Sequence, residues 1–120
     1  MMLGACTILV VAGCSTRSPE QQRTRGVVLY AAYCESCHDT EEGIGPRLTP
    51  QVLATRLTAA KLFTYNKEKM PYNAGGILTE AQYWDITAFL LTRSRLMNDD
   101  VFLDRRNAED VILTTPIIPD

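Results

Sequence analysis

Apolar residues recur at helical spacing through much of the chain after position 26. Between Gly26 and Cys34 they follow an i, i+3, i+4 pattern, which predicts an amphipathic helix that begins at Gly26. Its apolar positions are Val28, Leu29, Tyr30, Ala32 and Tyr33.

Three further helices are predicted downstream, over residues 51–57, over residues 59–67, and from Thr79 onwards. Thr79 and Gln82 have the spacing of a capping box, so Thr79 marks a helix start. This last helix should end between residues 93 and 96. No window alternates with period two, so we predict no sheet and an all-α fold. The last helix carries on one face Tyr83, Ile86, Phe89 and Leu90.

The N-terminal segment has a different composition. Residues 3–13 are apolar or small apart from Cys6 and Thr7. This stretch is too short to cross a bilayer but fits the apolar region of an export signal, although no Lys or Arg precedes it. The run Val-Ala-Gly-Cys that ends at Cys14 resembles a bacterial lipobox. It implies a lipoprotein signal peptide at 1–13 and a diacylated Cys14; an ordinary cleaved signal is the alternative.

The remaining chain divides into three parts. Residues 15–25 are polar and lack a core-forming pattern, so 14–25 are predicted to be a lipid anchor with a flexible tether. One folded domain at 26–95 and a C-terminal extension at 96–120 follow. The net charge of −2 and the spread of charges give no reason to expect nucleic acid as a partner.

The segment Cys34-Glu35-Ser36-Cys37-His38 is the candidate chemical site. In such a run both thiols can join a haem as thioethers, and the adjacent imidazole can ligate its iron. His38 is the only histidine in the chain. A thioredoxin-like pair would need a strand before it, and a zinc site would need more Cys or His downstream. The sequence shows neither, so the predicted cofactor is one covalent haem c.

Further motifs are Gly26 with Tyr30, Ile86 with Phe89, Gly45-Pro46-x-Leu48, Met70-Pro71, and Gly75-Gly76-x-Leu78-Thr79. Together with the cysteine motif, they resemble those of class I c-type cytochromes. The resemblance covers residues 26–95 and implies a cytochrome c fold, with three to five short helices wrapped around one covalently attached haem. It also implies that the Pro46 carbonyl accepts a hydrogen bond from His38 and that Met70 is the sixth iron ligand.

The predicted ligand set indicates function. A haem iron held by His38 and Met70 has no open position, so the expected activity is one-electron transfer rather than catalysis. The resemblance suggests a periplasmic dehydrogenase as donor and an oxidase or another cytochrome of the respiratory chain as acceptor. The expected location is the periplasmic side of a bacterial envelope membrane, with a lipid anchor. The alternatives are a haem enzyme or gas sensor with a vacant sixth position, and a cytochrome subunit of a larger oxidoreductase.

Two sets of residues have open roles. Side chains that can contact the haem propionates or tune the axial sulfur, or simply pack in the core or on the surface, are Arg47, Tyr65, Tyr72, Asn73 and Trp84. The extension can dock on a partner or fold back over the domain through its apolar positions Val101, Phe102, Leu103, Val111, Ile112 and Leu113.

Overall fold

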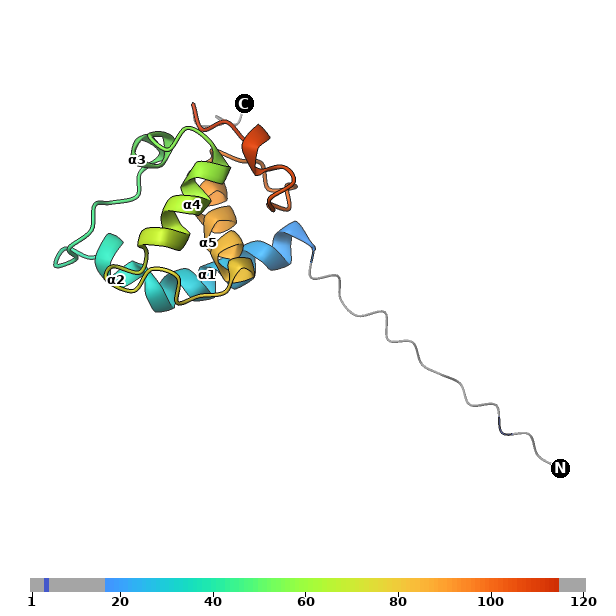
Figure 1. Ribbon diagram of the computed structural model, residues 1–120, viewed down its shortest axis with the longest axis horizontal. Coiled ribbons are helices and arrows are strands. Elements are labelled where there is room, and N and C mark those ends of the chain that lie inside the picture. Colours follow the sequence, from blue (N-terminus) through green and yellow to red (C-terminus); the bar gives the residue numbers. More distant parts are fainter. Residues whose placement is uncertain (1–3, 5–16, 115–120) are drawn as a thin grey trace.

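The computed structural model describes residue 4 and residues 17–114, and residues 17–114 form a helical domain (Figure 1). Its elements are α1 (Pro19–Tyr33), α2 (Glu35–His38), α3 (Pro50–Ala54), α4 (Ala59–Lys69), α5 (Glu80–Arg93) and a 3-10 turn at Ala108–Asp110. These residues form no β-strand, only an isolated antiparallel bridge between Thr58 and Ile112. The all-α prediction is confirmed. No helix among them is long and apolar enough to span a bilayer.

Helices α1 and α5 cross in close contact at Gly26. A Cβ atom at this position would lie 2.2 Å from the Asp85 carbonyl oxygen and 2.7 Å from the Phe89 Cβ, so only glycine permits the crossing. Next to it, the rings of Tyr30 and Phe89 pack with centroids 5.4 Å apart and planes inclined by 58°. The predicted packing of a small residue and two aromatic rings is confirmed.

The prediction of a flexible tether is wrong for residues 19–25, which form the first half of α1. Ser18 caps this helix by accepting a hydrogen bond from the Gln21 N–H, and Pro19 occupies the first turn. Gln22 is buried, and both ends of its side-chain amide are hydrogen-bonded there. The amide donates to the Leu103 carbonyl and accepts from the Leu103 N–H, both at 2.8 Å. The predicted signal peptide, apart from Gly4, and the lipidation site Cys14 lie outside the described residues.

The C-terminal extension folds back and completes the core. Backbone hydrogen bonds of 2.9 Å join the Leu113 N–H to the Leu57 carbonyl and the Ala59 N–H to the Val111 carbonyl. The buried apolar side chains of the extension therefore pack on the domain itself rather than being available to a partner. Ile112, by contrast, stays 54 % exposed. The buried residues of the extension, as far as it is described, are Leu96, Met97, Leu103, Ala108 and Leu113.

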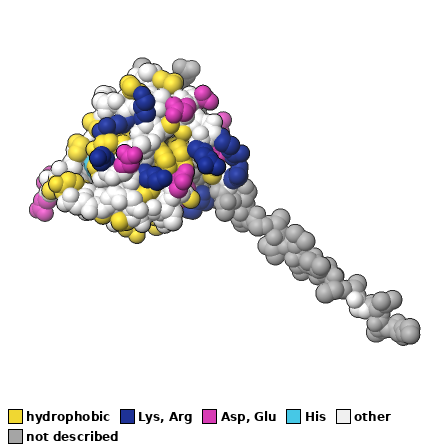
Figure 2. Space-filling view, viewed as in Figure 1, with side chains coloured by type: hydrophobic (Ala, Val, Ile, Leu, Met, Phe, Trp, Pro, Cys, Tyr) yellow, Lys and Arg dark blue, Asp and Glu magenta, His cyan; other side chains and the backbone are white. Residues whose placement is uncertain are grey.

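The shorter helices begin close to the predicted positions but end differently. Helix α4 continues to Lys69, beyond the predicted end at residue 67. Helix α3 ends at Ala54 rather than at 57, because the chain turns back through Leu57, whose φ is 73°, to pair with the extension. At α5 the capping box is confirmed, with reciprocal bonds of 3.1 and 2.9 Å between Thr79 and Gln82. On the face shown in Figure 2, basic and acidic side chains are interspersed rather than segregated.

The crossing predicts the effect of Gly26→Ala. Alanine normally favours a helix interior by roughly 0.5–1 kcal/mol over glycine, but here the methyl group must enter the backbone of α5. We expect the variant to lose about 1–3 kcal/mol of unfolding free energy. The measurement is urea denaturation of the haem-loaded protein. Val28→Ala, at a position 66 % exposed on the same helix, is the control and should stay near wild type. A fully stable Gly26→Ala protein would contradict the close crossing.

Candidate haem site

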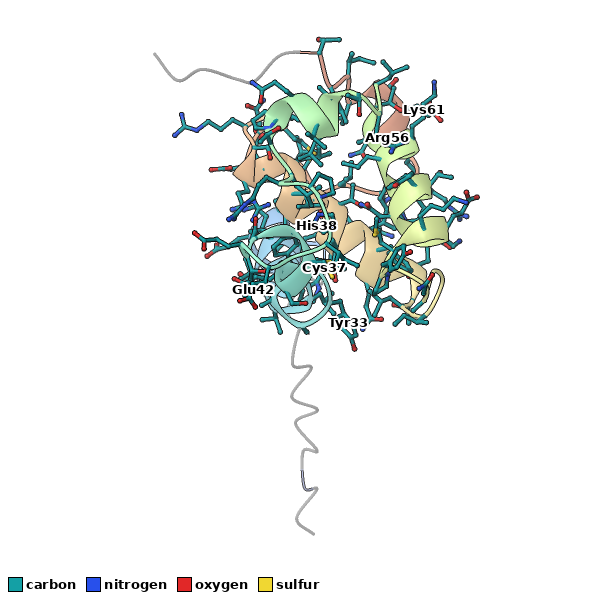
Figure 3. All side chains as sticks on the ribbon, turned by 90° about the vertical axis from the view of Figure 1, so that its left-hand side faces the viewer. Tyr33, Cys37, His38, Glu42, Arg56 and Lys61 are labelled. Carbon is teal, nitrogen blue, oxygen red and sulfur yellow. The ribbon has the colours of Figure 1, made fainter. Side chains whose placement is uncertain are left out.

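One cavity gathers all four predicted haem-binding residues of the domain. Cys34, Cys37, His38 and Met70 all line this one cavity. Figure 3 looks towards this side of the molecule, with Cys37 and His38 near the centre of the view. The cavity walls are otherwise mainly apolar or aromatic, as a macrocyclic ligand requires. The aliphatic wall residues are Leu48, Leu78, Ile86 and Leu90.

His38 is held in one orientation by its neighbouring loop. The side chain is buried, and its Nδ1 lies 2.7 Å from the Pro46 carbonyl oxygen. Since a carbonyl oxygen only accepts, Nδ1 carries the hydrogen and donates, which leaves the lone pair of Nε2 for a metal. The loop itself is fixed by a 2.9 Å bond from the Gly45 N–H to the Cys37 carbonyl. The predicted hydrogen bond between His38 and Pro46 is confirmed.

The two cysteines lie on either side of one helical turn. Cys34 ends α1 and begins α2, and its carbonyl accepts from the N–H groups of Cys37 and His38 at 3.2 and 3.1 Å. Burial, with the nearby Cys37, raises the pKa of the Cys34 thiol to about 11. A dithiol redox enzyme needs the opposite shift. Within residue 4 and residues 17–114, no three Cys, His, Asp or Glu side chains gather as a zinc site would need.

Met70 lines the same cavity from a second segment of the chain. It caps the C-terminus of α4 with an extended backbone, φ −120° and ψ 148°, and its N–H donates to the Asn66 carbonyl at 2.9 Å. Met97, the other methionine among residues 17–114, is buried in the core and does not line this cavity.

A charged cluster that the sequence analysis missed joins α1, α5 and the residue after His38. Asp39 accepts hydrogen bonds from the Tyr30 hydroxyl at 2.5 Å and from Arg93 at 3.0 Å. Burial alone would raise the pKa of Asp39, but these two donors outweigh it and hold that pKa below its ordinary value. Arg47, a candidate for a propionate contact, lies 4.0 Å from the same carboxylate.

The other candidate side chains are distributed between core and surface. Trp84 stacks on Phe63 with ring centroids 3.5 Å apart, and Tyr65 lies against the Arg56 guanidinium. Of the five candidates, only Tyr72 lines the cavity, where it is 65 % exposed.

Sequence reasoning missed two polar residues of the cavity wall, Asn66 and Tyr83. The signal for Tyr83 was present: a tyrosine on the buried face of a helix needs a hydrogen-bond partner for its hydroxyl.

The donor set fits a haem: two thiols, an imidazole with one nitrogen available, and a thioether, all on one apolar cavity. Residues 21–90 of the 120 match the family model described as cytochrome c oxidase, cbb3-type, subunit III. The chain belongs to this family of c-type cytochrome domains. This cytochrome domain therefore carries covalently bound haem c and takes part in haem-based electron transfer. No curated protein and no solved structure matches the chain.

The lowered pKa of Asp39 gives a pH-dependent prediction. A carboxylate whose folded pKa is lowered stabilises the fold above its unfolded pKa, about 3.9, and loses that contribution as pH falls through the folded value. Asp39→Asn should therefore reduce the unfolding free energy by about 1–2 kcal/mol at neutral pH, after discounting for partial exposure.

Urea denaturation of the haem-loaded proteins measures the difference in unfolding free energy between wild type and Asp39→Asn. It is measured at neutral pH and again below pH about 3.9, where this difference should shrink. Asp110→Asn, which changes an exposed carboxylate, serves as the control and should match wild type. A gap that stays constant across this range would refute the electrostatic account.

Proposed function

We propose that this cytochrome is a one-electron carrier in which Cys34 and Cys37 hold haem c by thioethers. His38 and Met70 are the proposed axial ligands. The bound group would supply a reversible Fe(III)/Fe(II) couple. One observation carries the proposal: Met70, from the end of α4, lines the same cavity as Cys34, Cys37 and His38, and the bond from His38 to Pro46 leaves only Nε2 available.

The protein's contribution is to keep both ligands fixed and water out. Apolar walls lower the local polarity, and the Pro46 carbonyl keeps the His38 ring from turning. If both His38 and Met70 bound the iron, no position would remain for a substrate, which supports an electron carrier rather than an enzyme. A Met ligand also raises the reduction potential.

The cysteine side of the cavity is the proposed route for the electron. Cys34 and Cys37 are partly exposed, whereas His38 is buried. Two exposed aromatic side chains, Tyr33 and Tyr72, lie at the same cavity. A partner that docks here comes closer to the haem edge than one on any face covered by helices.

The proposed location is the periplasmic side of a bacterial membrane, with Cys14 as lipid anchor. The proposed donor is a periplasmic dehydrogenase, and the proposed acceptor is an oxidase or another cytochrome. Because α1 begins at Pro19, only residues 15–18 separate it from Cys14. Four residues reach at most about 14 Å, so the anchor would hold the domain close to the membrane.

A second candidate is a permanent cytochrome subunit of a larger oxidoreductase. It is favoured by the family description, which names a subunit of an oxidase complex. Native size separation of detergent-solubilised membranes, followed by haem staining of the band, distinguishes the two. A carrier migrates alone, and a subunit migrates with its complex.

Met70→Ala tests the proposed sixth ligand. The variant should keep its covalent haem, bind carbon monoxide rapidly when reduced, and lose the weak red absorption band of thioether-ligated ferric haem. Its midpoint potential should fall, because Met ligation raises it. Reduced wild-type protein should bind carbon monoxide slowly at neutral pH. Equally fast binding by wild type would favour the gas sensor or haem enzyme instead.

Two controls accompany this test. Met97→Leu, a volume-conserving change in the core, should leave the spectra unchanged. Cys34→Ser/Cys37→Ser should release its haem on acid–acetone extraction, which checks the attachment independently of Met70.

Cys14→Ser tests the anchor. Wild-type protein should sediment with the membranes and be released by detergent, because two acyl chains give stable attachment. The variant should appear in a soluble fraction, if it is exported, with an unchanged haem spectrum. Cys6→Ser, a matched change within the predicted signal, should remain with the membranes. Wild-type protein found in the soluble fraction would exclude the anchor while leaving the haem site intact.

A further inference from the structure

The loop that carries Met70 is folded tightly against the end of α4. Its Ala74 N–H donates to the Pro71 carbonyl at 2.8 Å. At Gly75, an added Cβ would lie 2.1 Å from the Glu68 carbonyl oxygen, so the loop backbone rests directly on the helix backbone. The path of the chain between Met70 and Gly76 is thus compact.

Tyr83 of α5 closes this loop with a single hydroxyl. The Tyr83 O–H donates to the Met70 carbonyl at 2.7 Å, and the same oxygen accepts from the Gly76 N–H at 3.0 Å. The two ends of the loop are thereby joined to each other and to the last helix. Both bonds involve backbone groups, so they leave the Met70 thioether unengaged.

Tyr83 is itself held rigidly. It is 1 % exposed, and its carbonyl accepts from the Thr87 hydroxyl at 2.8 Å. The Thr87 hydroxyl in turn accepts from the Asn66 side-chain amide of α4 at 3.2 Å. The hydroxyl that holds the loop therefore projects from the packed contact between two helices.

We propose that Tyr83 is the positioning residue for the sixth ligand, acting through the backbone of the loop that carries Met70. This inference rests on the proposed ligation by Met70. A thioether has no N–H or O–H group by which it can be oriented, and its side chain has three rotatable bonds. The rate at which Met70 leaves the iron is then governed by local opening of its loop, and the Tyr83 hydroxyl opposes that opening.

The test compares Tyr83→Phe with wild type as haem-loaded proteins. Imidazole is the probe, since it binds ferric iron only when Met70 has left. Loss of the two hydrogen bonds predicts imidazole binding faster by roughly tenfold or more. The red thioether band should also weaken, or disappear at a lower pH than in wild type.

Thr87→Val is the matched control. It removes a buried hydroxyl from the same helix contact but leaves both bonds to the loop in place. The expected result is reduced stability to urea with a wild-type rate of imidazole binding. If Tyr83→Phe keeps the wild-type rate and band, the proposal is wrong. It is equally wrong if both variants accelerate binding in proportion to their lost stability, because Tyr83 would then support only the fold.

A measurement on wild-type protein covers the case in which Tyr83→Phe does not assemble. The Gly76 N–H should be protected from hydrogen exchange, although it lies in a loop, and exchange as fast as that of an exposed amide overturns the proposal. Failure of the Met70 assignment is recognised separately: wild-type protein would then lack the red band and bind imidazole as fast as Met70→Ala. That result would overturn the role of Tyr83 together with the ligand it positions.

Discussion

The backbone contact between α1 and α5 at Gly26 determines where the walls of the haem cavity lie. Gly26 precedes Cys34 by two turns of helix, so the position of the crossing sets the position of both thiols. On α5 the same contact involves Asp85 and Phe89, which flank the cavity residue Ile86. A side chain at Gly26 would separate the two helices and widen the space between the cysteine wall and the α5 wall.

The extension joins the hydrophobic core of the domain on the side away from α2 (Figure 1). A domain of this size buries a marginal apolar core by itself. Here Leu103 and Leu113, both fully buried, enlarge that core, and the amide of Gln22 ties the extension to the start of α1. Among the described residues, no buried side-chain polar atom is left without a hydrogen-bond partner. The hydrogen bonds between Gln22 and Leu103 thus hold the part of α1 that precedes Gly26, although its sequence is polar.

Features marked by a motif were predictable from the sequence, including the crossing of α1 and α5, which has a motif on each helix. Contacts between distant residues that no motif marks were not predictable. The capping box of α5 and the bond between His38 and Pro46 each follow from a short motif. The burial of Gln22 depends on Leu103, which is 81 positions away. The early end of α3 likewise depends on a pairing of Leu57 with the extension, and nothing near either residue in the sequence signals it.

The two sides of the cavity are held by different means, and this difference follows from the chemistry of the two side chains. An imidazole carries a ring N–H, so the Pro46 carbonyl orients the His38 ring itself. A thioether offers no such group, so the protein can hold Met70 only through its backbone, as Tyr83 and the packing at Gly75 do. With both residues as ligands, the histidine side would be fixed directly and the methionine side would depend on the stability of a loop. The methionine side is then the one at which a substitution in the fold would alter the iron's sixth position, because loss of the Tyr83 hydroxyl would release both ends of the loop that carries Met70.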